Sequence, residues 1–261
     1  MIARKYLAYR IGNNLFGYHN GKWGIIEDTI ENEIKKWIQF SYSIEKKNRV
    51  MDFVRKHAYE IDRMPNPDLV IVFQNAIYHW EYDRVYSISP YFYYRNTIPH
   101  DLDVEFFNKY IHENEKDVTG LYDIEKIMND EMPSILGIFK SWSNQWKTLI
   151  EIIGYTLYPR YILHKAFMLH GSGSNGKTTY LRLLNDILGE NNVSSISLQE
   201  ISERPFSRVP LHNKLANIFS DIPAQPLKYT GYFKVLTGED SISADRKNRD
   251  YIICKLCKTN L

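Results

Sequence analysis

Apolar residues alternate with polar ones on both sides of Asn20-Gly21, a dipeptide that favours the tight type I′ turn of a β-hairpin. Residues 15–26 are therefore predicted to form a hairpin. The spacing then becomes helical, and Asp28 and Glu31 have the separation of a capping box at a helix start. The side chains expected on the buried face of this helix are Ile34, Trp37 and Ile38.

Further helical and strand-like segments follow in the first 160 residues. Residues 43–64 have the apolar spacing of a longer helix, which Pro65-Asn66-Pro67 would end. Short apolar runs at 69–73 and 77–80 indicate two strands. Another helix is expected at 146–157. The segments up to residue 80 predict a mixed α/β module that packs around aromatic side chains and carries no visible chemistry.

The C-terminal part begins with an apolar stretch at 161–169 that is expected to form a strand. Apolar residues at helical spacing then predict a helix at 180–188, which Gly189 would end. A second apolar strand is expected at 214–221, and a second helix at 229–236.

The pattern G-x-x-x-x-G-K-[ST] lies between the first of these strands and its helix. Its glycines allow a turn that points backbone N–H groups at a nucleotide's phosphates, and a helix N-terminus adds attraction for anions. Lys177 would reach the outer phosphates, and the Thr178 hydroxyl would hold Mg²⁺. The residues expected to bind the nucleotide are Gly171, Ser172, Gly173, Ser174, Asn175, Gly176, Lys177, Thr178 and Thr179.

An acidic residue, Asp221, ends the apolar strand expected at 214–221. A phosphate-loop site needs a carboxylate at the end of a separate strand, where it holds Mg²⁺ or orients the attacking water. Asp221 is the candidate for either role, as metal ligand or as catalytic base. The alternative is an Asp that only forms a turn.

Three cations, Arg246, Lys247 and Arg249, lie within four positions of a polar turn that precedes an apolar strand. A loop or hairpin with these charges could bind a DNA backbone, and a solvated surface is the competing interpretation. Upstream, the run Tyr-Phe-Tyr-Tyr-Arg at residues 91–95 could stack bases beside a cation. An edge strand with one buried face is favoured there.

The composition of the chain bears on nucleic-acid binding, on the use of its cysteines and on its location. The 261 residues carry a net charge of +2, so the whole molecule has no strong basic field for nucleic acid. Cys254 and Cys257 give no disulfide framework, suit a reducing cytoplasm and have the spacing of half a zinc site. Because no run of about 18 apolar residues occurs, no membrane association is expected and the predicted location is the cytoplasm.

Taken in order, the motifs resemble those of superfamily 3 helicases, specifically the helicase portion of phage and plasmid primases and the poxvirus primase-helicase. Residues 171–178 look like the first Walker motif and 217–221 like the second. The third motif of that family, a DNA-contacting hairpin, resembles 233–247, and the start of its last motif resembles 255–260. Upstream segments similar to the domain that precedes the ATPase are residues 20–23, 67–75 and 151–155.

The resemblance implies an α/β fold class with an AAA+-type P-loop core and a parallel sheet. The core would occupy 161–261, after an N-terminal mixed α/β module at 1–120 and a helical collar at 121–160. The implied assembly is a homo-oligomeric ring, usually a hexamer, with ATP and Mg²⁺ at subunit interfaces and single-stranded DNA in the channel. In a virus, it would act in the host cytoplasm.

The resemblance also implies a role for each candidate site residue. Lys177 would stabilise charge that develops on the γ-phosphate, and Thr178 and Asp221 would hold Mg²⁺. Asn260 would sense the nucleotide or position the attacking water. The hairpin cations Arg246, Lys247 and Arg249 would contact the DNA phosphates.

Three departures from the family pattern leave alternatives open. The second motif supplies one acidic residue, Asp221, where members of the family often carry an acidic pair or a Glu. No primase domain is recognisable, so priming would need a separate protein. The sequence reaches Leu261 before the family's arginine finger, which suggests an incomplete core; Arg204 and Arg208 could face a neighbour, although their spacing does not argue for it. The functions considered are an ATP-dependent replicative DNA helicase and a truncated nucleotide- and DNA-binding module with little hydrolysis. A small-molecule kinase is disfavoured because no acceptor-binding residues are recognisable.

Overall fold

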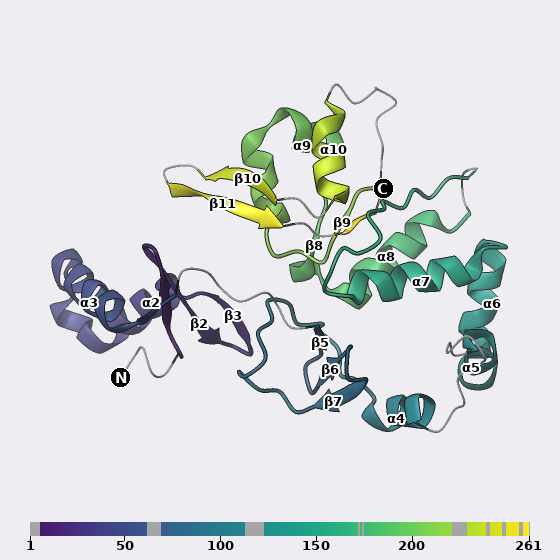
Figure 1. Ribbon diagram of the computed structural model, residues 1–261, viewed down its shortest axis with the longest axis horizontal. Coiled ribbons are helices and arrows are strands. Elements are labelled where there is room, and N and C mark those ends of the chain that lie inside the picture. Colours follow the sequence, from purple (N-terminus) through teal and green to yellow (C-terminus); the bar gives the residue numbers. More distant parts are fainter. Residues whose placement is uncertain are drawn as a thin grey trace. The chain divides into compact units, whose positions relative to one another are not determined.

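The computed structural model describes residues 6–61, 69–112, 123–171, 173, 175–220, 229–238, 241–246, 249–255 and 258–260 (Figure 1). The chain divides into two compact units. The first consists of Met1–Asp68 and Ser87–Thr97, and the second of Leu69–Tyr86 and Ile98–Leu261.

The first unit is a four-stranded sheet with helices against one face. The strands lie in the order β3-β2-β1-β4, antiparallel except that β4 runs parallel to β1. Their bounds are β1 (Tyr9–Ile11), β2 (Asn14–His19), β3 (Lys22–Ile25) and β4 (Tyr59–Glu60). The helices are α2 (Glu27–Ile38), the short 3-10 helix η1 (Gln39–Ser41) and α3 (Ile44–His57). The core of this unit includes Leu15, Ile30, Ile34, Met51 and Val54.

The predicted hairpin is confirmed, because Asn20 and Gly21 join β2 to β3 with positive φ angles of 49° and 73°. The predicted capping box is wrong. The helix α2 begins at Glu27 without a side-chain cap, and the Glu27 carboxylate instead accepts a hydrogen bond from the Leu15 backbone N–H at 2.6 Å. Packing of α2 follows the i, i+4 positions Ile30, Ile34 and Ile38, which leaves Trp37 60% exposed rather than buried.

Two further expectations for this unit also need correction. The helix expected over 43–64 ends at His57, and Tyr59–Glu60 continues as the strand β4. Residues 91–95 form no edge strand: the side chain of Tyr91 is exposed, whereas Tyr93 and Tyr94 are buried. The proline-containing stop at residues 65–67 lies outside the described residues.

The second unit begins with a small antiparallel sheet and continues through a run of helices. The two strands expected at 69–73 and 77–80 are confirmed as β5 (Val70–Val72) and β6 (Ile77–His79), which pair with β7 (Arg84–Tyr86). The helices are α4 (Val104–His112), α5 (Ile124–Glu131), α6 (Pro133–Trp142), α7 (Trp146–Leu157) and α8 (Lys177–Leu188). The helix predicted at 146–157 is therefore confirmed.

A three-stranded parallel sheet, in the order β12-β9-β8, follows α8. Its strands are β8 (Val193–Ser194), β9 (Ala216–Ile218) and β12 (Lys258–Asn260). The short helix η2 (Glu190–Asn192) precedes β8. The elements between the three strands are α9 (Leu198–Glu203), η3 (Pro205–Leu211), α10 (Thr230–Thr237), β10 (Ser241–Arg246) and β11 (Arg249–Lys255). The helices expected at 180–188 and 229–236 are confirmed, and Gly189 ends α8 with a φ of 80°. The strand expected at 214–221 is confirmed only at its centre, because β9 ends at Ile218 and Asp221 lies outside the described residues.

The strand expected at 161–169 is wrong, since the segment contains only an isolated bridge at Phe167. It folds back on itself instead of extending. The Tyr161 hydroxyl donates to the Lys165 carbonyl, His164 has a φ of 51°, and the Leu163 N–H donates to the Tyr155 hydroxyl at 3.1 Å. The structure therefore shows a mixed α/β fold with a parallel sheet, but no regular strand leads directly into the glycine-rich loop.

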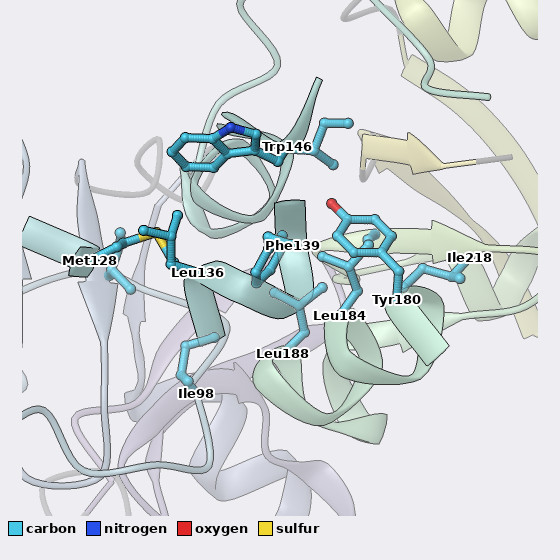
Figure 2. Packing of buried hydrophobic residues seen from close by; sticks show 12 residues of the cluster. Ile98, Met128, Leu136, Phe139, Trp146, Tyr180, Leu184, Leu188 and Ile218 are labelled. Carbon is cyan, nitrogen blue, oxygen red and sulfur yellow. The ribbon is translucent and has the colours of Figure 1, made fainter. Parts of the chain in front are cut away.

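The main hydrophobic core joins α8 to the preceding helices and to the parallel sheet. Figure 2 shows Leu184 and Leu188 of α8 beside Phe139 of α6, with Tyr180 and Ile218 close by. Each fully buried side chain of this size contributes roughly 1.5–3 kcal/mol through removal of apolar surface from water. The helix that follows the glycine-rich loop is therefore anchored along its length. Among the described helices, none has both the length and the apolar character needed to cross a membrane.

Candidate nucleotide-binding site

The glycine-rich loop ends at the N-terminus of α8. Gly176 takes the N-cap position with a φ of 86°, a left-handed conformation that favours glycine. Lys177 is the first residue of the helix, and Thr178 and Thr179 are exposed in its first turn. The N-cap residue Gly176 makes no side-chain capping bond, and the helix dipole favours negative charge at this end.

The Lys177 ammonium group connects the two ends of the loop. It donates to the Gly171 carbonyl at 2.9 Å and to the Asn175 amide oxygen at 2.7 Å. A Cβ on Gly171 would lie only 2.2 Å from Asn175 Nδ2, so a larger residue there would displace the exposed Asn175 side chain. The structure therefore brings the lysine and the loop backbone together, while Ser172 and Ser174 lie outside the described residues.

Trp142, at the end of α6, covers the base of the loop. A Cβ on Gly176 would lie 2.5 Å from the indole atoms Cδ1 and Nε1 of Trp142. The indole also packs edge-on against Phe139 and Tyr180, with ring centroids 5.3 and 6.2 Å apart. Sequence reasoning missed Trp142, because the contact joins residues far apart in the chain and no motif marks it.

Tyr180 secures the same region from the helix side. Its hydroxyl donates to the Leu149 carbonyl of α7 at 2.7 Å, and burial raises the pKa of its phenol. The phenol therefore stays protonated and remains a hydrogen-bond donor throughout the ordinary pH range. As a result, both α6 and α7 fix the start of α8, the helix that carries Lys177.

The parallel strands β9 and β12 lead to the two remaining catalytic candidates, Asn260 and Asp221, and the structure describes only the first of them. Asn260 ends β12 in register with Ile218, the last residue of β9. Asp221 follows β9 by three positions and lies outside the described residues, so its role as metal ligand or base stays a prediction. The structure thus places the backbone of Asn260 next to the strand that leads toward Asp221.

Asn217, in the middle of β9, is fully buried and has a structural role. Its amide oxygen accepts from the Ser194 hydroxyl at 2.9 Å and from the Ile196 N–H at 3.0 Å, and its Nδ2 donates to the Ile196 carbonyl at 2.9 Å. The side chain therefore fixes the chain just after β8 to the central strand. The sequence motif gave no sign of this role.

We expect Asn217→Ala to lower the free energy of unfolding by about 2–4 kcal/mol, because it removes the side-chain partner of the buried Ile196 N–H and carbonyl and one partner of the Ser194 hydroxyl. Denaturant titration measures the change. Asn75→Ala is the matched control, since Asn75 makes two comparable bonds to the Leu102 backbone at 2.9 Å but is exposed, where water can replace the amide. Equal losses in the two variants would contradict a burial-dependent role for Asn217.

The cationic turn is the closed end of an antiparallel hairpin formed by β10 and β11, as the sequence allowed. Arg246 and Arg249 occupy opposed register positions at this end. Lys247 lies outside the described residues. Two of the three cations expected to contact DNA, Arg246 and Arg249, therefore lie at the same end of this strand pair.

Arg208 cannot serve as a residue that faces a neighbouring subunit. It is buried, its Nε donates to the Ile201 carbonyl at 2.8 Å, and its guanidinium carbon lies 3.9 Å from the ring centroid of Tyr232. Arg204 is exposed, with a guanidinium nitrogen 3.9 Å from the Glu200 carboxylate. In the described part of the chain, no cluster of three His, Cys, Asp or Glu side chains is placed to hold a metal. The side chains of the two cysteines lie outside what the structure describes.

Fold and site together define a mixed α/β protein in which a glycine-rich loop with an inward-facing lysine begins a helix. The chain belongs to the family described as D5 N terminal like, which it matches over residues 2–145. Residues 169–259 match a family of unknown function, DUF5906. The first match supports the relationship to viral primase-helicases that the order of motifs indicates.

Solved structures of a protein called NrS-1 cover nearly the whole chain at low similarity. "The A form apo structure of NrS-1 C terminal region-CTR" is 13% identical with a TM-score of 0.49, and it covers 97% of this chain and 52% of that chain. An apo structure of the NrS-1 C-terminal region is also 13% identical, with a TM-score of 0.44 and coverage of 97% and 53%. The chain therefore spans about half the length of these structures. No curated protein matches the chain significantly.

Proposed function

We propose that the chain is the ATP-dependent helicase part of a viral, phage or plasmid replication protein of the superfamily 3 class. The observation that carries the proposal is the loop at the start of α8, where the Lys177 ammonium group lies between Gly171 and Asn175 and Gly176 makes no side-chain capping bond at the helix start. This arrangement suits the phosphates of a nucleotide. Membership in the D5 N terminal like family supports a role in replication.

In this proposal, the residues of the loop have separate tasks. Lys177 exchanges its contacts with the loop for the outer phosphates and stabilises the negative charge that develops on the γ-phosphate. Thr178 and Asp221 would hold Mg²⁺, which neutralises phosphate charge during transfer to water. Asn260 would orient the attacking water.

The DNA-binding part of the proposal rests on the hairpin of β10 and β11. Arg246, Lys247 and Arg249 at its closed end would contact the phosphates of single-stranded DNA. A homo-oligomeric ring would place these hairpins around one strand, so that hydrolysis at the loop moves the bound DNA. Priming would come from a separate protein or domain.

The test is ATP hydrolysis by the purified chain with and without oligo(dT). We expect DNA to stimulate hydrolysis, and Arg246→Ala with Arg249→Ala to remove most of that stimulation while ATP binding persists. Arg84→Ala, which removes an exposed Arg of β7 in the second unit, is the control and should keep the stimulation. ATP binding without turnover under any condition would contradict the motor and indicate a binding module. Stimulation by a small phosphoryl acceptor instead of DNA would indicate a kinase.

A further inference from the structure

Four apolar side chains form a continuous row across the sheet of the first unit. The strand register pairs Ile25 of β3 with Phe16 of β2, Phe16 with Tyr9 of β1, and Tyr9 with Tyr59 of β4. Directly paired residues project from the same face, so the row crosses all four strands. The rings of Tyr9 and Tyr59 contact edge-on with centroids 6.1 Å apart.

This row lies on the face of the sheet opposite the helices. Leu15, next to Phe16 in β2, points the other way into the core with Ile30 and Ile34 of α2, and α2 and α3 lie together beside the strands (Figure 1). On the opposite face, the Tyr59 side chain is 72% exposed and Ile25 is 47% exposed. Three aromatic residues and an isoleucine therefore form a broad, solvent-accessible apolar strip.

The remainder of this face is held rigid by residues 87–97. The Trp23 indole N–H is shared between the Pro90 and Phe92 carbonyls, both at 3.2 Å, and the hydroxyls of Tyr18 and Tyr94 are 2.8 Å apart. Because the Trp23 ring lies 5.8 Å from that of Tyr9, this packing supports the exposed row from one side. The strip therefore borders a packed group of aromatic side chains.

The charge around the strip is suited to an anionic partner. The first unit carries a net charge of +4, from thirteen Lys and Arg against nine Asp and Glu, whereas the rest of the chain carries −2. Within the four strands, which the structure describes completely, the one acidic residue is Glu60, and it forms an ion pair with Arg10 on the other face. No strand carboxylate would therefore repel a phosphate on the aromatic face.

We propose that this aromatic face of the first unit binds single-stranded nucleic acid by stacking of bases on Tyr59, Tyr9 and Phe16. Every base has a π-face, so flat exposed rings bind single strands with little sequence preference, and a positive domain attracts the backbone. The contact is separate from the β10–β11 hairpin and needs no nucleotide. It would hold the strand independently of hydrolysis.

The experiment measures the affinity of the full chain for fluorescein-labelled oligo(dT) by anisotropy, without ATP and in the Lys177→Ala background. Because Lys177→Ala removes the lysine of the nucleotide loop, the measured DNA affinity does not depend on whether the chain hydrolyses ATP. Tyr59→Ala should weaken binding by about fivefold to a hundredfold, the range found for loss of one stacked base, and Tyr59→Phe should restore it. Since Tyr59 is largely exposed, either variant should fold.

Charge reversal and a matched aromatic provide independent checks. Ile25→Glu should weaken oligo(dT) binding and Ile25→Lys should not, because the two changes alter the same position with opposite charge. Trp37→Ala removes a similarly exposed ring from α2 and should leave binding unchanged. Unchanged affinity in Tyr59→Ala and Ile25→Glu would overturn the proposal. Unchanged affinity together with an altered oligomeric mass would instead assign the strip to contacts between copies of the chain.

Discussion

Lys177→Ala is expected to reduce ATP hydrolysis by at least about 10²–10³-fold, the effect of removing one charged donor from a transition-state site. The structure gives the reason, because the ammonium group lies inside the loop within 2.9 Å of the Gly171 carbonyl, where phosphates would bind. Steady-state phosphate release with saturating ATP, with and without oligo(dT), measures the loss.

The control for this prediction is Lys126→Ala, which removes an exposed lysine from α5 in the same unit. Its hydrolysis should match that of the unmodified chain. Lys177→Arg tests geometry separately from charge, since a planar guanidinium keeps the positive charge but cannot occupy the position of the ammonium. If Lys177→Ala bound and hydrolysed ATP like the unmodified chain, the loop would not be a nucleotide site.

Gly176→Ala is expected to lower the free energy of unfolding by about 2–5 kcal/mol and to weaken nucleotide binding sharply. The left-handed backbone disfavours any Cβ by roughly 1–2 kcal/mol, and overpacking against the Trp142 indole adds about 1–3 kcal/mol. Denaturant titration and a nucleotide-binding titration on the same preparations measure the two effects.

A double-mutant cycle with Trp142→Ala separates the two causes. Removal of the indole should relieve the steric part of the Gly176→Ala loss and leave the conformational part, which gives a favourable coupling free energy. Gly173→Ala is the matched control in the same loop, because its Cβ would meet nothing within 4 Å and its backbone is not left-handed. A Gly176→Ala variant as stable as Gly173→Ala would contradict the packing described for Trp142.

Local sequence signals predicted the elements that depend on local chemistry. The turn at Asn20-Gly21 needs only two residues that tolerate positive φ, and α8 needs only apolar residues at helical spacing and a glycine at its end. The strand expected at 161–169 was wrong. The Leu163 N–H, which a strand would pair with a neighbouring strand, donates instead to the side-chain hydroxyl of Tyr155. An apolar run shows that a segment is buried, but it does not show which partner takes its backbone groups.

For the candidate site, the sequence predicted the residues of the loop motif but not the side chains that pack against it. The spacing of the loop identified Gly176 and Lys177, whose places at the helix start follow from chain order. The contact of Trp142 with Gly176 and the three bonds of Asn217 depend on tertiary packing, and no pattern in the sequence marks either. The role of Asp221 rests on its place after an apolar strand and on family resemblance, the role of Asn260 rests on the resemblance alone, and both remain predictions.

The first unit is discontinuous in sequence, since Leu69–Tyr86 belongs to the second unit while Ser87–Thr97 returns to the first. During synthesis on the ribosome, the N-terminal sheet therefore lacks its last segment until residue 97 has emerged. Until then, the indole N–H of Trp23 lacks the Pro90 and Phe92 carbonyls, and Tyr18 lacks the hydroxyl of Tyr94. Completion of the first unit must wait for translation of part of the second, which links the order of their folding.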